Sequence, residues 1–177
     1  MNAALRLSWY KFKHHYMDFI KVLLGIVAFE GLILYIQDKG FLKDFETTRM
    51  TLFLLLFSTS LLIVVQNSIY ISKERSVLNR DFFSGLSRSA FALASMGIHA
   101  FFAVLETIVF ILSYSVFSKF FDKEFPDAGH IFGSYRWEVG ITVLLVFLAS
   151  HFIALFISAL VGKSEITSVI LAVVVGI

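Results

Sequence analysis

Four long apolar runs, separated by polar segments, constrain the fold of this chain most strongly. They cover residues 19–38, 50–72, 89–118 and 139–162. Each is close to or longer than the roughly 20 residues that an α-helix needs to cross about 30 Å of hydrocarbon. A backbone surrounded by lipid must satisfy its own hydrogen bonds, so these runs predict helices. We therefore expect an all-α, polytopic integral membrane bundle.

The composition supports the same class. Hydrophobic residues make up 58% of the 177 residues, the mean hydropathy is +0.84, and only 16% of residues are charged. Ordinary soluble domains are roughly 45–50% apolar, so lipid must be part of the solvent of this chain. The net charge of +2 is too small to indicate a nucleic-acid partner. The lack of cysteine excludes disulfides and thiol catalysis.

Two of the apolar runs have unusual lengths. The third, residues 89–118, is longer than one span requires, so it either projects beyond the bilayer or breaks near Gly97. A fifth run, residues 166–177, reaches only about 18 Å as a helix. We interpret it as a span cut off midway. The expectation is one transmembrane domain over residues 1–177, truncated at its C-terminus, with about five spans of a complete six.

The N-terminal segment has a helical pattern of its own. Leu5, Trp9, Phe12 and Tyr16 are spaced at i, i+4, i+7 and i+11. This spacing favours an amphipathic lead helix over residues 1–18 that lies in the headgroup region. The alternative is an ordinary basic flank of the first span.

A charged segment, residues 73–88, separates the second and third runs, and we call it the elbow. If the elbow is helical, Leu78, Phe82 and Leu86 share one face, and Arg80 lies roughly opposite. Such a helix can rest its apolar face on the bundle and offer its charges to a soluble partner. The alternative is a basic loop that only sets the topology.

The distribution of Lys and Arg orients the chain. The N-terminal segment and the elbow carry four basic residues each, whereas the first and third loops carry three each, balanced by acidic residues. The positive-inside rule therefore favours a cytoplasmic N-terminus. Alternation of the spans then places the elbow on the cytoplasmic side. We expect the protein to reside in the cell membrane.

The elbow resembles a loop of a known family. Lys73-Glu74-Arg75, Asn79-Arg80-Asp81 and the stretch Ser84-Gly85-Leu86-Ser87-Arg88-Ser89-Ala90-Phe91 are similar to the loop between the second and third membrane helices of ABC exporter permeases. The resemblance is to the type-two branch that includes pigment and sterol exporters. The order of the other segments agrees, and residues 159–165 resemble the second cytoplasmic contact of that family.

The resemblance implies that an ATPase docks on the elbow and that its closure on ATP drives alternating access of the helices. It implies coupling roles for these residues: Glu74, Arg75, Arg80, Asp81, Gly85 and Arg88. Gly85 would also permit a tight return into the third span.

The resemblance also implies the partners and the place of the cofactors. The partners would be an ABC ATPase, separate or fused, a second permease copy and membrane lipid, with ATP and Mg²⁺ on the ATPase and no cofactor in this chain. Gly162-Lys163-Ser164 has the last letters of a nucleotide-binding loop, but Ile157 stands where that loop needs glycine. The alternative function is a membrane scaffold or anchor that recruits a cytoplasmic partner, and the sequence leaves the cargo open.

Four ionisable residues lie within the apolar runs: Glu30, His99, Glu106 and His151. Ionisable groups inside a membrane are costly and often functional. His99 and Glu106 are seven residues apart and so lie on one helix stripe, which could line a polar translocation path. The alternative is a hydrogen-bonded contact between helices. No catalytic set or metal-ligand spacing is present, so an intramembrane enzyme ranks last.

Overall fold

The computed structural model describes residues 2–37, 45–121, 131, 133–161 and 164–176, with side chains described except at 2–9, 11–15, 45–46, 73–74 and 176. The helices, in chain order, are α1 (Asn2–Ile36), α2 (Phe45–Asn67), α3 (Tyr70–Phe83), α4 (Arg88–Phe120), α5 (Tyr135–Leu160) and α6 (Glu165–Gly176). No strand occurs within the described ranges. The predicted all-α bundle is confirmed.

Four helical segments of the described chain are long and apolar enough to cross a membrane: Tyr16–Ile36, Thr47–Ser72, Arg88–Phe120 and Tyr135–Leu160. The four predicted spans are therefore confirmed. The third is one continuous helix of 33 residues, so the alternative of a break near Gly97 is wrong. At about 1.5 Å per residue it reaches about 50 Å, which is longer than the hydrocarbon layer.

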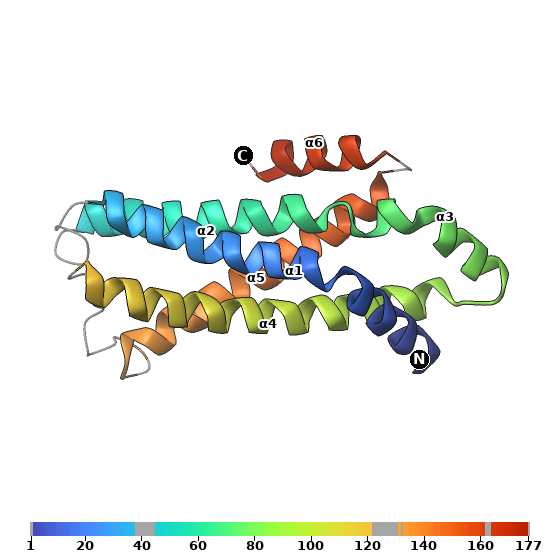
Figure 1. Ribbon diagram of the computed structural model, residues 1–177, viewed down its shortest axis with the longest axis horizontal. Helices are drawn as coiled ribbons and strands as arrows, with labels where there is room; N and C mark the ends of the chain where they lie inside the picture. The colour runs from blue at the N-terminus through green and yellow to red at the C-terminus, as the bar shows by residue number, and fades with distance from the viewer. Residues whose placement is uncertain (1, 38–44, 122–130, 132, 162–163, 177) are drawn as a thin grey trace.

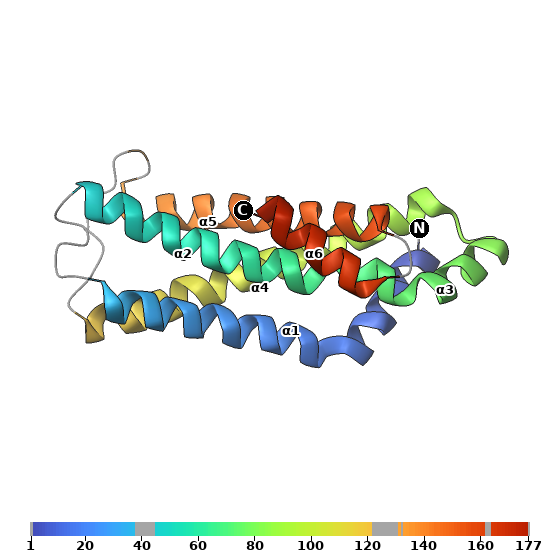
Figure 2. The same cartoon turned by 90° about the horizontal axis from the view of Figure 1, so that it is seen from above.

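The long helices α1, α2, α4 and α5 run along the length of the molecule (Figure 1). The amphipathic helix α3 lies at one end, and the start of α1 lies at that same end. The end of α1, the start of α2, the end of α4 and the start of α5 lie at the opposite end (Figure 1). Figure 2 shows α6 beside α2 and α5, running back from the α3 end. The start of the chain and the elbow thus share one side, as an alternating topology requires.

Side chains from all four long helices meet in one apolar core. Ile26 of α1, Ile63 of α2, Tyr114 of α4 and Phe147 of α5 are all almost completely buried. The outer faces of these helices carry many exposed apolar side chains instead, Leu145 among them. A helix that is apolar on both its inner and outer faces suits a bundle surrounded by lipid.

The N-terminal part of α1 changes direction relative to the rest of the helix (Figures 1 and 2). Despite this bend, α1 is one helix from Asn2 to Ile36, so the predicted lead segment joins the first span without a non-helical linker. The side chains of Leu5, Trp9 and Phe12 lie outside the described residues, and Tyr16 is half exposed. The amphipathic character of residues 1–18 stays a prediction.

Candidate functional site

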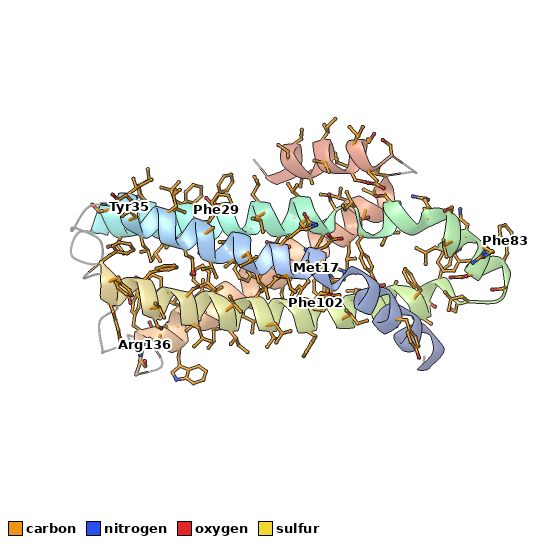
Figure 3. The ribbon with its side chains drawn as sticks, in the orientation of Figure 1. Met17, Phe29, Tyr35, Phe83, Phe102 and Arg136 are labelled. Atoms are coloured by element: carbon orange, nitrogen blue, oxygen red, sulfur yellow. The ribbon has the colours of Figure 1, made fainter. Side chains whose placement is uncertain are left out.

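The elbow is helical over most of its length and has two distinct faces. Leu78 is only 2% exposed, whereas Arg80 is exposed and Phe83 is 92% exposed. The rings of Phe82 and Phe91 meet edge to face at 5.9 Å and so pack α3 against α4. The apolar face of α3 thus rests on the bundle, and Arg80 lies exposed on another face. Phe83, at this end, and Arg136, at the opposite end, mark the length of the bundle in Figure 3.

The helix ends earlier than the elbow pattern suggested. The amide of Gly85 donates to the carbonyl of Phe82 at 3.2 Å, and the amide of Leu86 donates to the carbonyl of Asp81 at 3.0 Å. This pair of bonds is a Schellman motif, which needs a left-handed residue after the helix end. Gly85 supplies it with φ +103°. The helix α3 therefore stops at Phe83, so the helical spacing holds for Leu78 and Phe82 but not for Leu86, and a tight turn leads into α4.

The turn also starts the next helix. The side chain of Ser87 accepts a bond from the amide of Ala90 at 3.5 Å and caps the N-terminus of α4. The expectation that Gly85 permits a tight return is confirmed by its backbone conformation.

The predicted coupling residues lie in different surroundings. Arg80, Gly85 and Arg88 are exposed, and Asp81 is half-buried. The guanidinium of Arg88 lies over the ring of Phe82, 5.6 Å from its centroid. The side chain of Glu74 lies outside the described residues. The roles of all these residues in coupling to an ATPase stay predictions.

Arg75 differs from the other coupling candidates because it turns toward the bundle. Its Nη1 donates to the carbonyl of Val161 at 2.5 Å and to that of Ala159 at 3.3 Å. These carbonyls belong to the last turn and the C-cap of α5, where no later helical amide is available to bond them. The C-terminal end of α5 is thus held by a side chain of α3. Gly162 and Lys163, in the turn that resembles a second cytoplasmic contact, lie outside the described residues.

Ser158 of α5 makes the opposite contact. Its Oγ accepts bonds from the amides of Ile71 at 2.8 Å and Ser72 at 3.1 Å. These amides lie in the first turn of α3, whose own N-cap, Ile69, makes no side-chain cap bond. The hydroxyl of Ser168 in α6 also reaches the hydroxyl of Ser72, at 3.2 Å. The start of α3 is therefore anchored to α5 and α6.

Inside the bundle, His151 of α5 joins the two ionisable residues of α4. Its Nε2 lies 2.8 Å from Oε2 of Glu106, and its Nδ1 lies 3.0 Å from Nδ1 of His99. All three side chains are at most 1% exposed. The rings of Tyr70 and His99 meet edge to face, with their centroids 4.9 Å apart. The cluster therefore also contacts α3.

The bonding pattern of this cluster determines which nitrogens can carry protons. If a neutral His151 donates through Nε2 to the Glu106 carboxylate, its Nδ1 can only accept, and His99 must donate through Nδ1. His99 Nε2 and Glu106 Oε1 then keep no hydrogen-bond partner among the described residues. Within those residues, no group of three or more His, Cys, Asp or Glu side chains is arranged to hold a metal ion.

The predicted stripe of His99 and Glu106 is confirmed as geometry, because both side chains point to the same neighbour on α5. Its use as a translocation path stays untested. Sequence reasoning missed the bridging position of His151 and the capping role of Ser158. A signal was present, because these two residues are also seven apart and so share one stripe of α5.

A second buried contact joins α1 to α4. The hydroxyl of Ser113 donates to the carboxylate of Glu30, which is fully buried. Glu30 and Ser113, like Glu106 and His151, thus join neighbouring helices, a role that buried polar groups commonly have in membrane bundles.

Comparison with protein families matches the chain over residues 5–177 to the family described as ABC-2 type transporter. Comparison with curated proteins finds no match, and comparison with solved structures finds none either. The expected likeness to the branch of pigment and sterol exporters stays a prediction. The family match covers nearly the whole chain, including the elbow and all four membrane-spanning segments. The chain therefore belongs to the ABC-2 type transporter family, as the membrane-embedded permease component of an ABC transporter.

Proposed function

We propose that this permease is the membrane half of an ATP-driven exporter and that α3 is the surface on which its ATPase docks. The observation that carries the proposal is the position and character of α3. It lies at one end of the bundle (Figure 1), buries Leu78 against the bundle and leaves Arg80 exposed. A rigid, amphipathic helix at this place can receive a push from a soluble partner and pass it to the spans.

A hollow beside α3 offers a partner a place to insert a side chain. It has a volume of about 330 Å³ and lies between α3, the start of α4 and the end of α5. Asn79 and Arg88 line it together with apolar residues such as Phe91. Acidic or amide side chains on an ATPase surface would match these donors.

In this proposal ATP and Mg²⁺ bind to the ATPase, and this chain contributes the helices that move. Two copies of the permease, or this copy and a related one, would enclose the path of the cargo. The α3 end would face the cytoplasm, and the protein would reside in the cell membrane. The excess of basic residues in the N-terminal segment and the elbow supports this orientation.

The experiment is a charge reversal on the proposed docking surface. The tagged chain is purified from its native membranes, and co-purified proteins with an ATP-binding cassette are identified by mass spectrometry. We expect the Arg80→Glu variant to lose the ATPase, because like charges brought together at an interface cost several kcal/mol. The matched control is Arg136→Glu, the same reversal on an exposed residue at the opposite end (Figure 3), which should retain it.

Retention of the ATPase by the Arg80→Glu variant would contradict docking at α3. Capture of a different cytoplasmic protein, with no ATPase present and with loss on the same reversal, would favour the alternative of a membrane scaffold.

A further inference from the structure

The ends of α3 and α5 cap each other. Ser158 of α5 bonds two amides in the first turn of α3, and Arg75 of α3 bonds two carbonyls at the end of α5. We name this set of contacts the reciprocal cap. The contacts join segments more than 80 residues apart in the sequence, so they depend entirely on the folded bundle.

The reciprocal cap satisfies groups that neither helix can satisfy alone. The first amides and the last carbonyls of a helix have no partner within that helix. Ser158 is fully buried, whereas Arg75 is half-buried. If the bonds to Ser158 broke, water could therefore replace them only poorly. Pulling α3 away from α5 would therefore strand polar groups in the bundle.

The covalent connections add to this attachment. The short turn at Gly85 joins α3 to α4, whereas the reciprocal cap joins α3 to α5 without a direct covalent link. A displacement of α3 would thus reach α5 as well as the two spans, α2 and α4, to which α3 is covalently joined. Ser168 extends the attachment to α6 through Ser72.

We propose that Ser158 and Arg75 are positioning residues that make α3 and the end of α5 move as one body during the ATPase cycle. This inference rests on the proposed docking of an ATPase at α3, and it goes further by naming the route along which force leaves α3. In this proposal Arg75 has an internal role, in place of the contact with the ATPase that the family resemblance implies.

The first test needs no ATPase. Hydrogen exchange of the purified chain is followed in the peptide that contains Ile71 and Ser72. The Ser158→Ala variant should exchange there about tenfold faster, because each amide loses its acceptor. The matched control is Ser150→Ala, another buried serine of α5, whose hydroxyl bonds only within its own helix, to Val146. It should leave that peptide unchanged.

The second test measures movement in the complex with the ATPase. The chain has no cysteine, so the substitutions Phe83→Cys and Leu160→Cys provide two thiols for spin labelling. Both positions are exposed, one on α3 and one on α5. We expect the distance between the labels to be the same with and without trapped nucleotide. In the Ser158→Ala or Arg75→Met variant the distance should change on trapping, while the bound ATPase still hydrolyses ATP. Arg75→Lys, which keeps a charged donor, should restore part of the parent behaviour.

The outcomes separate the two proposals. Absence of a bound ATPase would defeat the docking proposal, and the exchange measurement would still decide the reciprocal cap. Unchanged exchange in Ser158→Ala, or a label distance that shifts in the parent on trapping, would overturn the reciprocal cap itself. If Ser158→Ala does not fold, Arg75→Met at a half-buried position carries the label measurement alone.

Discussion

Oε2 of Glu106 lies 2.8 Å from Nε2 of His151, with both side chains completely buried between α4 and α5. This contact joins two spans at a place without access to water. Loss of either side chain therefore leaves the other without this hydrogen bond inside the bundle. Polar contacts of this kind hold membrane helices in one arrangement. They also raise the question of whether the cluster serves more than packing.

Replacement of Glu106 separates a role in holding the helices together from a role in a translocation path. Glu106→Ala should lower the free energy of unfolding by about 1–3 kcal/mol, because the ring of His151 loses its acceptor. Glu106→Gln keeps a carbonyl oxygen and should be close to neutral. Denaturation of the purified protein measures both. Unchanged ATP-dependent transport and unchanged ATPase coupling of the complex with Glu106→Gln would remove the hypothesis of a translocation path along His99 and Glu106.

The Schellman motif at the end of α3 predicts a strong dependence on glycine. Gly85→Ala should destabilise the protein by roughly 1–2 kcal/mol, because φ +103° is unfavourable for an L-residue. Gly97→Ala is the control: Gly97 lies within α4, and its added Cβ meets no atom within 4 Å. The control should be neutral or stabilising by about 0.5–1 kcal/mol, since alanine favours a helix. Equal effects at the two positions would argue against the turn.

Close packing of α1 on α2 predicts that a larger residue at Gly25 is harmful. A Cβ at Gly25 would lie 2.5 Å from Cδ1 of Leu62, so Gly25→Val should cost about 1–3 kcal/mol in unfolding free energy. Adding Leu62→Ala should recover part of this loss by making room. A double-mutant cycle measures the recovery. Strictly additive effects would show that the two helices do not meet at these residues.

The bond between Ser113 and Glu30 predicts a difference between two serines of α4. Ser113→Ala removes the donor to the buried Glu30 carboxylate and should destabilise the protein by about 1–3 kcal/mol. The hydroxyl of Ser115 bonds only to the carbonyl of Ile111 in its own helix, so Ser115→Ala should have a much smaller effect. Thermal unfolding in detergent compares the variants. A loss for Ser115→Ala as large as that for Ser113→Ala would contradict the assigned contact.

The spans could be predicted from the sequence because their length and apolar character are local properties of the chain. The amphipathic pattern of Leu78, Phe82 and Arg80 likewise predicted the faces of α3. The end of α3 stayed open at the level of the sequence, because the apolar spacing continues to Leu86, whereas the backbone has left the helix at Gly85. A glycine after a periodic run is a stop signal, and it competed with the pattern.

The contacts between helices could not be predicted in the same way. The stripe that Ser158 shares with His151 does not indicate that the Ser158 hydroxyl caps α3, because the partner amides lie 86 and 87 residues away. The position of His151 opposite His99 and Glu106 depends on the register of α5 against α4. Register in a bundle is set by packing of the whole interface, and a single sequence does not contain it.

Docking of an ATPase on α3 requires that α3 faces the cytoplasm, and single cysteines in this cysteine-free chain can test this orientation. The Phe83→Cys and Arg136→Cys variants place an exposed thiol at opposite ends of the bundle (Figure 3). Both are treated with a membrane-impermeant maleimide, in intact cells and in inside-out vesicles. We predict that Phe83→Cys reacts only in the vesicles and Arg136→Cys only in the cells. Reaction of Phe83→Cys in intact cells would contradict the cytoplasmic position of α3 and, with it, the docking of an ATPase there.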